Sequence, residues 1–98
     1  MDDVMLGIAR RDYALHSRHF SVDLKGRLTP EAFAEELERT ADSRGAPLER
    51  DFLCLFRKPK SFTLVWDQGF ARADGQVMAA MTVALKGGRY FVDYFLLH

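Results

Sequence analysis

Two consecutive glycines, Gly87 and Gly88, lie between two apolar stretches near the end of the 98-residue sequence. A two-residue loop of this kind takes the positive φ angles of a primed turn, which joins two antiparallel strands directly. The turn predicts a register that places four pairs on one face of the hairpin: Leu85 with Tyr90, Val83 with Val92, Met81 with Tyr94 and Ala79 with Leu96. The other face pairs small residues with large ones, and we expect it to receive a helix: Ala84 with Phe91, Thr82 with Asp93 and Ala80 with Phe95.

One helix is predicted between residues 29 and 45. Thr29 suits the N-cap, Pro30 suits the first helical position, and Gly45 suits a left-handed C-terminal cap. Phe33 and Leu37 recur at helical spacing on a narrow apolar stripe that suits packing on a sheet. The opposite side carries an acidic ridge of four residues: Glu31, Glu35, Glu38 and Asp42.

The other apolar segments predict strands. Residues 20–24 alternate strictly, and residues 52–56 and 61–66 flank a turn at 57–60 as a second hairpin. The first fifteen residues fit either a strand or an irregular arm. We therefore predict a single α+β domain over residues 1–98, with one mostly antiparallel sheet of about five strands and one main helix packed on it.

Composition sets the class of protein. The hydrophobic fraction of 48% and the charged fraction of 29% are typical of a globular domain. No apolar run approaches the roughly 20 residues that a membrane helix needs. The first residues, Met1–Asp3, are acidic where a secretory signal is basic, and the single cysteine cannot form an internal disulfide. We expect a soluble, cytoplasmic protein with no membrane association.

No pattern in the sequence predicts catalysis. Cys54 is flanked by leucines and is expected to be an inert core thiol. His16 and His19 are the only candidates for metal ligands, but a strand would point residues three apart to opposite faces, so we expect a solvated or hydrogen-bonded pair, or else a pH-sensitive contact. Asp93 lacks an acid or base partner other than the terminal His98 and is expected to be structural or to point to solvent. The sequence thus predicts no enzyme activity, no catalytic residue, no metal and no cofactor.

Charge is unevenly distributed although the net charge is zero. Residues 29–51 carry 3 − 7 = −4 and residues 52–98 carry 6 − 3 = +3. A local acidic face can steer a basic partner, whereas a neutral chain lacks the field that drives non-specific nucleic-acid binding. The basic turn Arg57–Lys60 lies next to Phe62 and Trp66 and is an alternative nucleic-acid patch, although both rings are expected to belong to the core.

The strands carry more aromatic residues than one interface between a sheet and a helix readily covers. Trp66, Tyr90 and Tyr94 are the candidates for an exposed contact patch, because tyrosine and tryptophan are common anchors of protein interfaces. This expectation weakens if an N-terminal arm covers that side of the sheet. Residues 90–95 are also a candidate edge strand for self-association, so a monomer and a homodimer both remain open.

In size, charge layout and element order, the chain resembles the small immunity proteins of bacterial polymorphic and contact-dependent toxin systems. The resemblance spans the whole chain and rests on no motif, so no residue is carried over from that family. It implies that the chain neutralises a cognate toxin, such as a nuclease, by covering a basic cleft with acids that mimic phosphate: Glu31, Glu35, Glu38 and Asp42. Two alternatives remain open, a phage-type inhibitor or regulatory adaptor of a nucleoprotein complex and a small nucleic-acid-binding domain that uses the turn at 57–60.

Overall fold

Helices make up the N-terminal half of the chain and an antiparallel sheet makes up the C-terminal half. The computed structural model describes residues 1–72, 75 and 77–98, and it leaves aside the side chains of residues 41 and 42. Within these residues the elements follow in the order α1 (Asp2–Arg10), α2 (Tyr13–His16), α3 (Val22–Arg27), α4 (Pro30–Arg44), β1 (Pro47–Lys58), β2 (Ser61–Phe70), β3 (Val77–Lys86) and β4 (Arg89–Leu97). The α+β class and the antiparallel sheet are confirmed, but the described residues form four strands and four helices rather than about five strands and one main helix.

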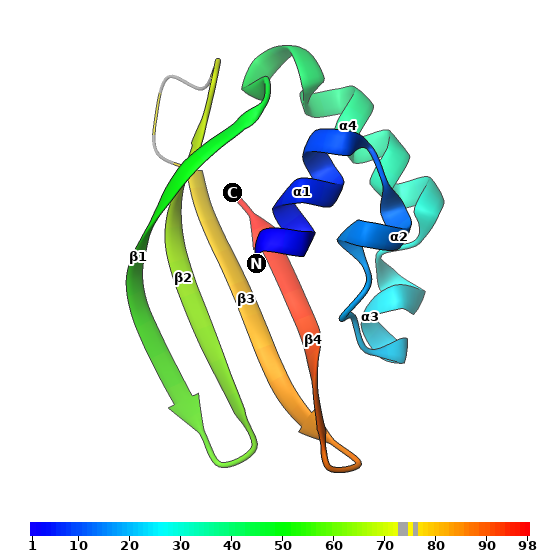
Figure 1. Cartoon of the computed structure of the whole chain (residues 1–98), viewed down its shortest axis with the longest axis vertical. Coiled ribbons are helices and arrows are strands. Elements are labelled where there is room, and N and C mark those ends of the chain that lie inside the picture. The colour runs from blue at the N-terminus through cyan, green and yellow to red at the C-terminus, as the bar shows by residue number, and fades with distance from the viewer. Residues whose placement is uncertain (73–74, 76) are drawn as a thin grey trace.

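Each strand pairs with the next one along the chain, so β1 and β4 are the two edges of the sheet (Figure 1). Gly87 and Gly88 take φ angles of 58° and 78°, which confirms the predicted turn between β3 and β4. The predicted register holds next to this turn, where Leu85 lies opposite Tyr90.

A register shift in the last hairpin changes the pairing farther from the turn. The irregularity lies between Thr82 and Val83, and it places Met81 opposite Phe95 instead of the predicted Tyr94. An extra residue in one strand moves every later side chain by one position relative to its partner. Tyr94 therefore lies opposite Thr82, on the other face of the sheet from Tyr90.

The N-terminal segment is helical, which corrects two predictions. The first fifteen residues contain α1 and α2 rather than a strand or an irregular arm. The strand predicted at residues 20–24 is wrong, because the Ser21 hydroxyl accepts a hydrogen bond from the Leu24 backbone N–H at 3.1 Å and caps α3. Only Phe20 keeps a strand-like contact, as a single parallel bridge to Val92 of β4.

Helices α1 and α3 supply the apolar cover of one face of the sheet, called the inner face. The main core joins Val4, Phe20 and Leu24 to Met81 and Val92 of the sheet. A smaller cluster lies where β2 ends and β3 begins, and it contains three further buried residues: Met5, Phe70 and Val77. The prediction that a helix covers the Ala80 and Ala84 face is therefore wrong; the inner face carries Met81 and Val92, which offer more apolar surface than alanines do.

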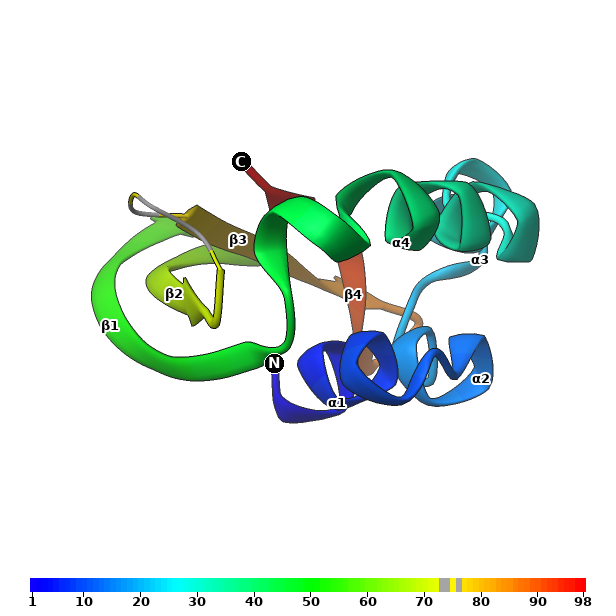
Figure 2. The same ribbon diagram turned by 90° about the horizontal axis from the view of Figure 1, so that it is seen from above.

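Helix α4 begins and ends as predicted, but it does not lie on the sheet through its apolar stripe. The Ala32 backbone N–H donates to the Thr29 hydroxyl at 3.2 Å, and Gly45 ends the helix at φ 72°. Phe33 stacks on the His16 ring with centroids 4.6 Å apart, so α2 receives this residue of the stripe, whereas Leu37 lines a groove beside α4. Seen from above, α3 and α4 lie on the β4 side of the molecule and β1 lies on the opposite side (Figure 2). Among the described helices, none has the length and apolar character needed to cross a bilayer.

Candidate binding surface on the open half of the sheet

The inner face of the sheet is covered by helices only in part. Four exposed side chains and the half-buried Phe62 lie near the two hairpin turns and along β1 on this face. Together they are called the open-face patch: Phe52, Leu55, Phe62, Leu85 and Tyr90. The strand register places them on one face, because Phe52 lies opposite Trp66 of the core and Leu85 lies opposite Tyr90. All five side chains therefore present apolar surface in one direction.

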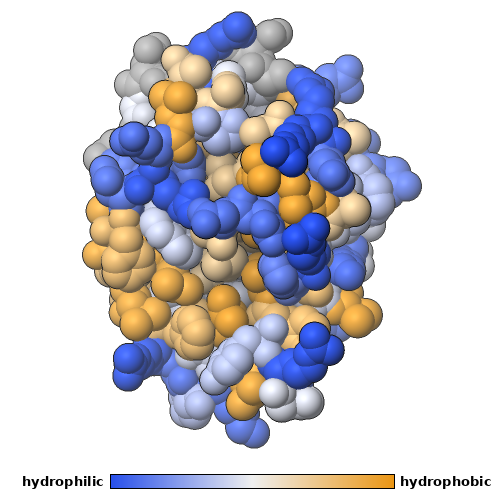
Figure 3. Space-filling view, in the orientation of Figure 1, coloured by the Kyte–Doolittle hydropathy of each residue, from blue (hydrophilic) through white to orange (hydrophobic). Residues whose placement is uncertain are grey.

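The largest members of the patch are strongly exposed. Tyr90 is 62% exposed and Phe52 is 55% exposed, whereas Phe62 is half-buried. The Phe62 and Tyr90 rings have centroids 5.9 Å apart, and the Phe52 ring meets the half-buried Trp66 at 6.0 Å. Figure 3 shows the resulting apolar surface over β1 and β2, beside and below α1. Contiguous exposed aromatic side chains of this kind mark interaction sites.

Cations surround the patch at the end of the sheet where the two turns lie. The Leu85 backbone N–H donates to the Lys60 carbonyl at 2.9 Å, which holds the first turn beside β3. Lys86 is bound by Asp93 at 2.9 Å and by Asp23 at 3.1 Å, and these carboxylates raise the pKa of its ammonium. The other cations at this end are exposed: Arg57, Lys58, Lys60 and Arg89.

Asp93 ties the sheet to α3. Its carboxylate accepts a hydrogen bond from the Ser21 hydroxyl at 2.7 Å, and this bond, followed by the contact with Lys86, lowers the pKa of Asp93. A carboxylate held in its charged form by such partners is a poor general acid. Asp93 thus has a structural role, as predicted.

The three predicted aromatic contact residues do not share one surface. Trp66 and Tyr90 lie on the inner face, but Tyr94, which is 42% exposed, lies on the outer face because of the bulge beside Val83. Two of the predicted anchors therefore belong to the open-face patch or adjoin it, and the third does not.

The acidic ridge of α4 is exposed but lies away from β1. Glu31, Glu35 and Glu38 follow at spacings of four and three on one exposed side of the helix, whereas the side chain of Asp42 lies outside the part that the structure describes. Glu36 binds Arg39 at 2.7 Å and raises the pKa of that guanidinium. Because α4 lies beside β4 and Phe52 lies on the opposite edge strand, the ridge and the whole aromatic surface do not form the single site that the sequence suggested (Figure 2).

The two histidines have separate structural partners. His16 is buried, its Nδ1–H donates to the Val4 carbonyl at 2.8 Å, and burial lowers the pKa of its imidazole. His19 is exposed, with Nε2 3.0 Å from the Asp3 carboxylate. No group of three metal-ligating side chains occurs among the residues with described positions. The hydrogen-bonded state predicted for these histidines is confirmed, although they are not paired with each other.

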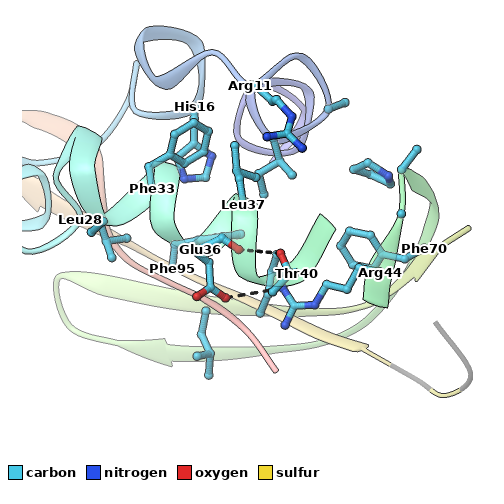
Figure 4. A pocket seen from close by; sticks show the side chains of 18 of the residues that line it. Arg11, His16, Leu28, Phe33, Glu36, Leu37, Thr40, Arg44, Phe70 and Phe95 are labelled. Carbon is cyan, nitrogen blue, oxygen red and sulfur yellow. Dashed lines mark hydrogen bonds and ion pairs between the residues drawn. The ribbon is translucent and has the colours of Figure 1, made fainter. Parts of the chain in front are cut away.

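A groove of about 560 Å³ separates α4 from α1 and the end of β4 (Figure 4). Phe33 and His16 close one end, and the Arg44 guanidinium lies 5.7 Å from the Phe70 ring centre at the other. The polar side chains of α4 in the groove are satisfied locally, because Thr40 donates to the Glu36 carbonyl and Arg44 lies 3.9 Å from the Glu36 carboxylate. The polar side chains that α4 contributes to the groove are therefore already bound within the chain and are less available to a ligand. The open-face patch is the stronger candidate for a binding site.

Sequence reasoning missed that β1 is exposed. The run Phe52–Phe56 is continuously apolar, which is typical of a strand buried on both faces. No layer formed by the described residues covers this edge, and Cys54 is exposed, so the prediction of a core thiol is wrong. Position in the sheet decides exposure, and no signal in the sequence fixes that position.

Comparison with known proteins does not place the chain in a family. No protein-family model matches the chain, and no curated protein or solved structure shows significant similarity to it. The function proposed below therefore rests on the surface itself.

Proposed function

We propose that this chain is a protein-binding module whose partner covers the open-face patch. The observation that carries the proposal is the exposure of Tyr90 and Phe52 on the same face as the core. Buried tyrosine and other aromatic anchors supply most of the binding energy of typical interfaces, and each can contribute about 2 kcal/mol or more. Covering the patch also removes exposed apolar area from water at roughly 25 cal/mol per Å².

The charges around the patch indicate the chemistry of the partner surface. Arg57, Lys60 and Arg89 lie near its rim at the turn end of the sheet. A partner surface that fits has an apolar centre bordered by acidic groups, which match these cations. Opposite charges at the rim of an interface raise the association rate more than they raise the affinity. Binding should therefore slow as salt is raised, since exposed charges are screened beyond a Debye length of about 8 Å at physiological salt.

The resemblance to immunity proteins supports a finer proposal, that the module is an inhibitor of a toxin. Under this proposal the exposed acids of α4, Glu35 and Glu38 among them, form a second contact for a basic toxin surface such as a nuclease cleft. Charge reversal at both residues should then slow association, whereas loss of an apolar anchor should mainly speed dissociation.

A nucleic-acid partner is the second candidate, and one observation favours it. The Phe62 and Tyr90 rings, which can stack on bases, lie near exposed cations at Lys58 and Lys60. If this candidate is correct, labelled RNA or single-stranded DNA binds the chain alone. Reversal of Lys58 and Lys60 to glutamate should then abolish that binding, with a steep dependence on salt.

One variant tests the proposal, and a second variant is its matched control. Tyr90→Ser removes an anchor of the patch, and Tyr94→Ser makes the same change on the same strand but on the outer face. Quantitative capture from nuclease-treated host extract identifies proteins that bind the wild type, and titration with the purified partner measures each variant. We expect Tyr90→Ser to weaken binding by about 30-fold, the equivalent of about 2 kcal/mol, and Tyr94→Ser to leave it nearly unchanged. Equal losses, or a loss confined to Tyr94→Ser, would contradict the open-face patch as the binding surface.

A further inference from the structure

The edge of β4 is occupied along its middle. The Ser21 backbone N–H donates to the Val92 carbonyl at 2.8 Å, and the Val92 N–H donates to the His19 carbonyl at 2.6 Å. The segment before α3 therefore lies against this edge, which corrects the expectation that residues 90–95 form an open edge for self-association. Nearer the end of β4, residues 95–97 line the groove beside α4 instead.

The groove beside α4 has the size and the lining of a small-ligand site. Its volume of about 560 Å³ lies within the range of roughly 300–1,000 Å³ that is typical of ligand pockets. The Thr40 hydroxyl donates to the Glu36 carbonyl within α4 at 2.8 Å, so an apolar chain in the groove leaves this polar group satisfied. Large apolar side chains line much of the groove: Ile8, Leu28, Phe33, Leu37, Phe95 and Leu97.

The charged groups of the groove are mostly basic. Arg44 and Arg72 line it, and the Arg72 backbone N–H donates to the Arg44 carbonyl at 2.9 Å, which holds the two residues next to each other. Arg11 adds a third cation from the α1 side (Figure 4). Glu36, which lies 3.9 Å from Arg44, is the one carboxylate among the described lining residues, so the charges sum to 3 − 1 = +2. A ligand that fits carries a negative group near Arg72, because a guanidinium binds a carboxylate through charge-assisted hydrogen bonds.

The polarity of the groove changes along α4. Phe33 lies at the apolar end, and Arg44 lies 44 − 33 = 11 residues farther along the helix, which is a rise of about 16 Å. We infer that the groove binds a fatty acid of medium chain length, with its alkyl chain along Leu37 and its carboxylate at Arg72, beside Arg44. The groove and the open-face patch have no lining residue in common, so this inference and the proposed function can fail separately.

Calorimetric titration with dodecanoate, kept below the concentration at which it forms micelles, tests the site. We expect saturable binding of one dodecanoate per chain and a higher melting temperature in its presence. Each buried methylene contributes up to about fourfold in affinity, so decanoate should bind several-fold more weakly. Dodecyltrimethylammonium has the same alkyl chain but a cationic head group, and it should not displace dodecanoate. Absence of saturable binding, or displacement by this cation, would overturn the inference.

A pair of variants tests the position of the carboxylate. Arg72→Glu places a negative charge at the basic end and should weaken dodecanoate binding by about tenfold or more. Arg10→Glu makes the same change at an exposed residue of α1 that does not line the groove, and it should leave binding unchanged. Equal losses in the two variants would indicate non-specific charge attraction and contradict the site.

A second pair tests the position of the alkyl chain. Ala32→Trp fills the apolar end of the groove with a larger side chain and should abolish dodecanoate binding, whereas Ala34→Trp, on an exposed position of the same helix, should preserve it. Circular dichroism checks that both variants fold. Tyr90→Ser should bind dodecanoate as the wild type does, because Tyr90 belongs to the open-face patch. Binding that survives Ala32→Trp, or that is lost in Tyr90→Ser, would place the ligand outside the groove and refute the inference.

Discussion

The contact between α1 and α2 allows a stringent test of the fold through Gly7. This glycine is buried where α1 crosses α2, and a Cβ atom added to it would lie 2.4 Å from the His16 backbone nitrogen and 2.5 Å from the His16 Cα atom. Backbone atoms cannot move away by changing a rotamer. In an unhindered helix, by contrast, Gly→Ala stabilises a protein by about 1 kcal/mol. Gly7→Ala should therefore destabilise although it improves helix propensity.

The magnitude follows from the distances. Restoring an ordinary contact of 3.4 Å to His16 requires the two helices to separate by about 1 Å, which also strains the 2.8 Å hydrogen bond between His16 and Val4. Overpacking of this kind costs about 1–3 kcal/mol, and more where backbone must move. We expect a net loss of about 2–3 kcal/mol in the free energy of unfolding, and a melting temperature lower by roughly 10–20 °C for a domain of this size.

Gly26→Ala is the matched control, because Gly26 lies in α3 with nothing within 4 Å of the added Cβ atom. This variant should gain about 0.5–1 kcal/mol. Urea unfolding followed by circular dichroism gives both values, provided that the denaturant slope stays unchanged. If Gly7→Ala is as stable as the wild type while Gly26→Ala gains stability, α1 and α2 do not approach each other as described. The packing of α1 on the inner face of the sheet would then also be wrong.

Two further predictions concern buried polar contacts. Because burial lowers the pKa of His16 below its usual value of 6.5, the unfolded chain takes up a proton that the folded chain does not. Stability should therefore fall as the pH drops from 6.5 toward the folded pKa, by up to about 1.4 kcal/mol per pH unit in urea titrations, and this slope should be absent in His16→Phe. Ser21→Ala removes both the cap of α3 and a bond to Asp93; we expect a loss of about 1–3 kcal/mol and, in an NMR titration, a rise in the pKa of Asp93. An unchanged Asp93 titration would contradict the role given to Ser21.

The parts of the fold that were predicted correctly depend on local chemistry. Gly87 and Gly88 determine a turn without help from the rest of the chain, and Thr29 and Gly45 mark the ends of α4 in the same way. Each signal acts within a few residues, so tertiary contacts have little chance to override it.

The failures come from segments whose structure depends on distant partners. Residues 20–24 alternate like a strand, yet Leu24 is buried against Val4 as part of a six-residue helix that would be unstable alone. The register shift beside Val83 has no signal in the sequence, although it decides which face Tyr94 occupies. The predicted exposure of Tyr90 and Tyr94 is therefore confirmed, but the two side chains lie on opposite faces of the sheet.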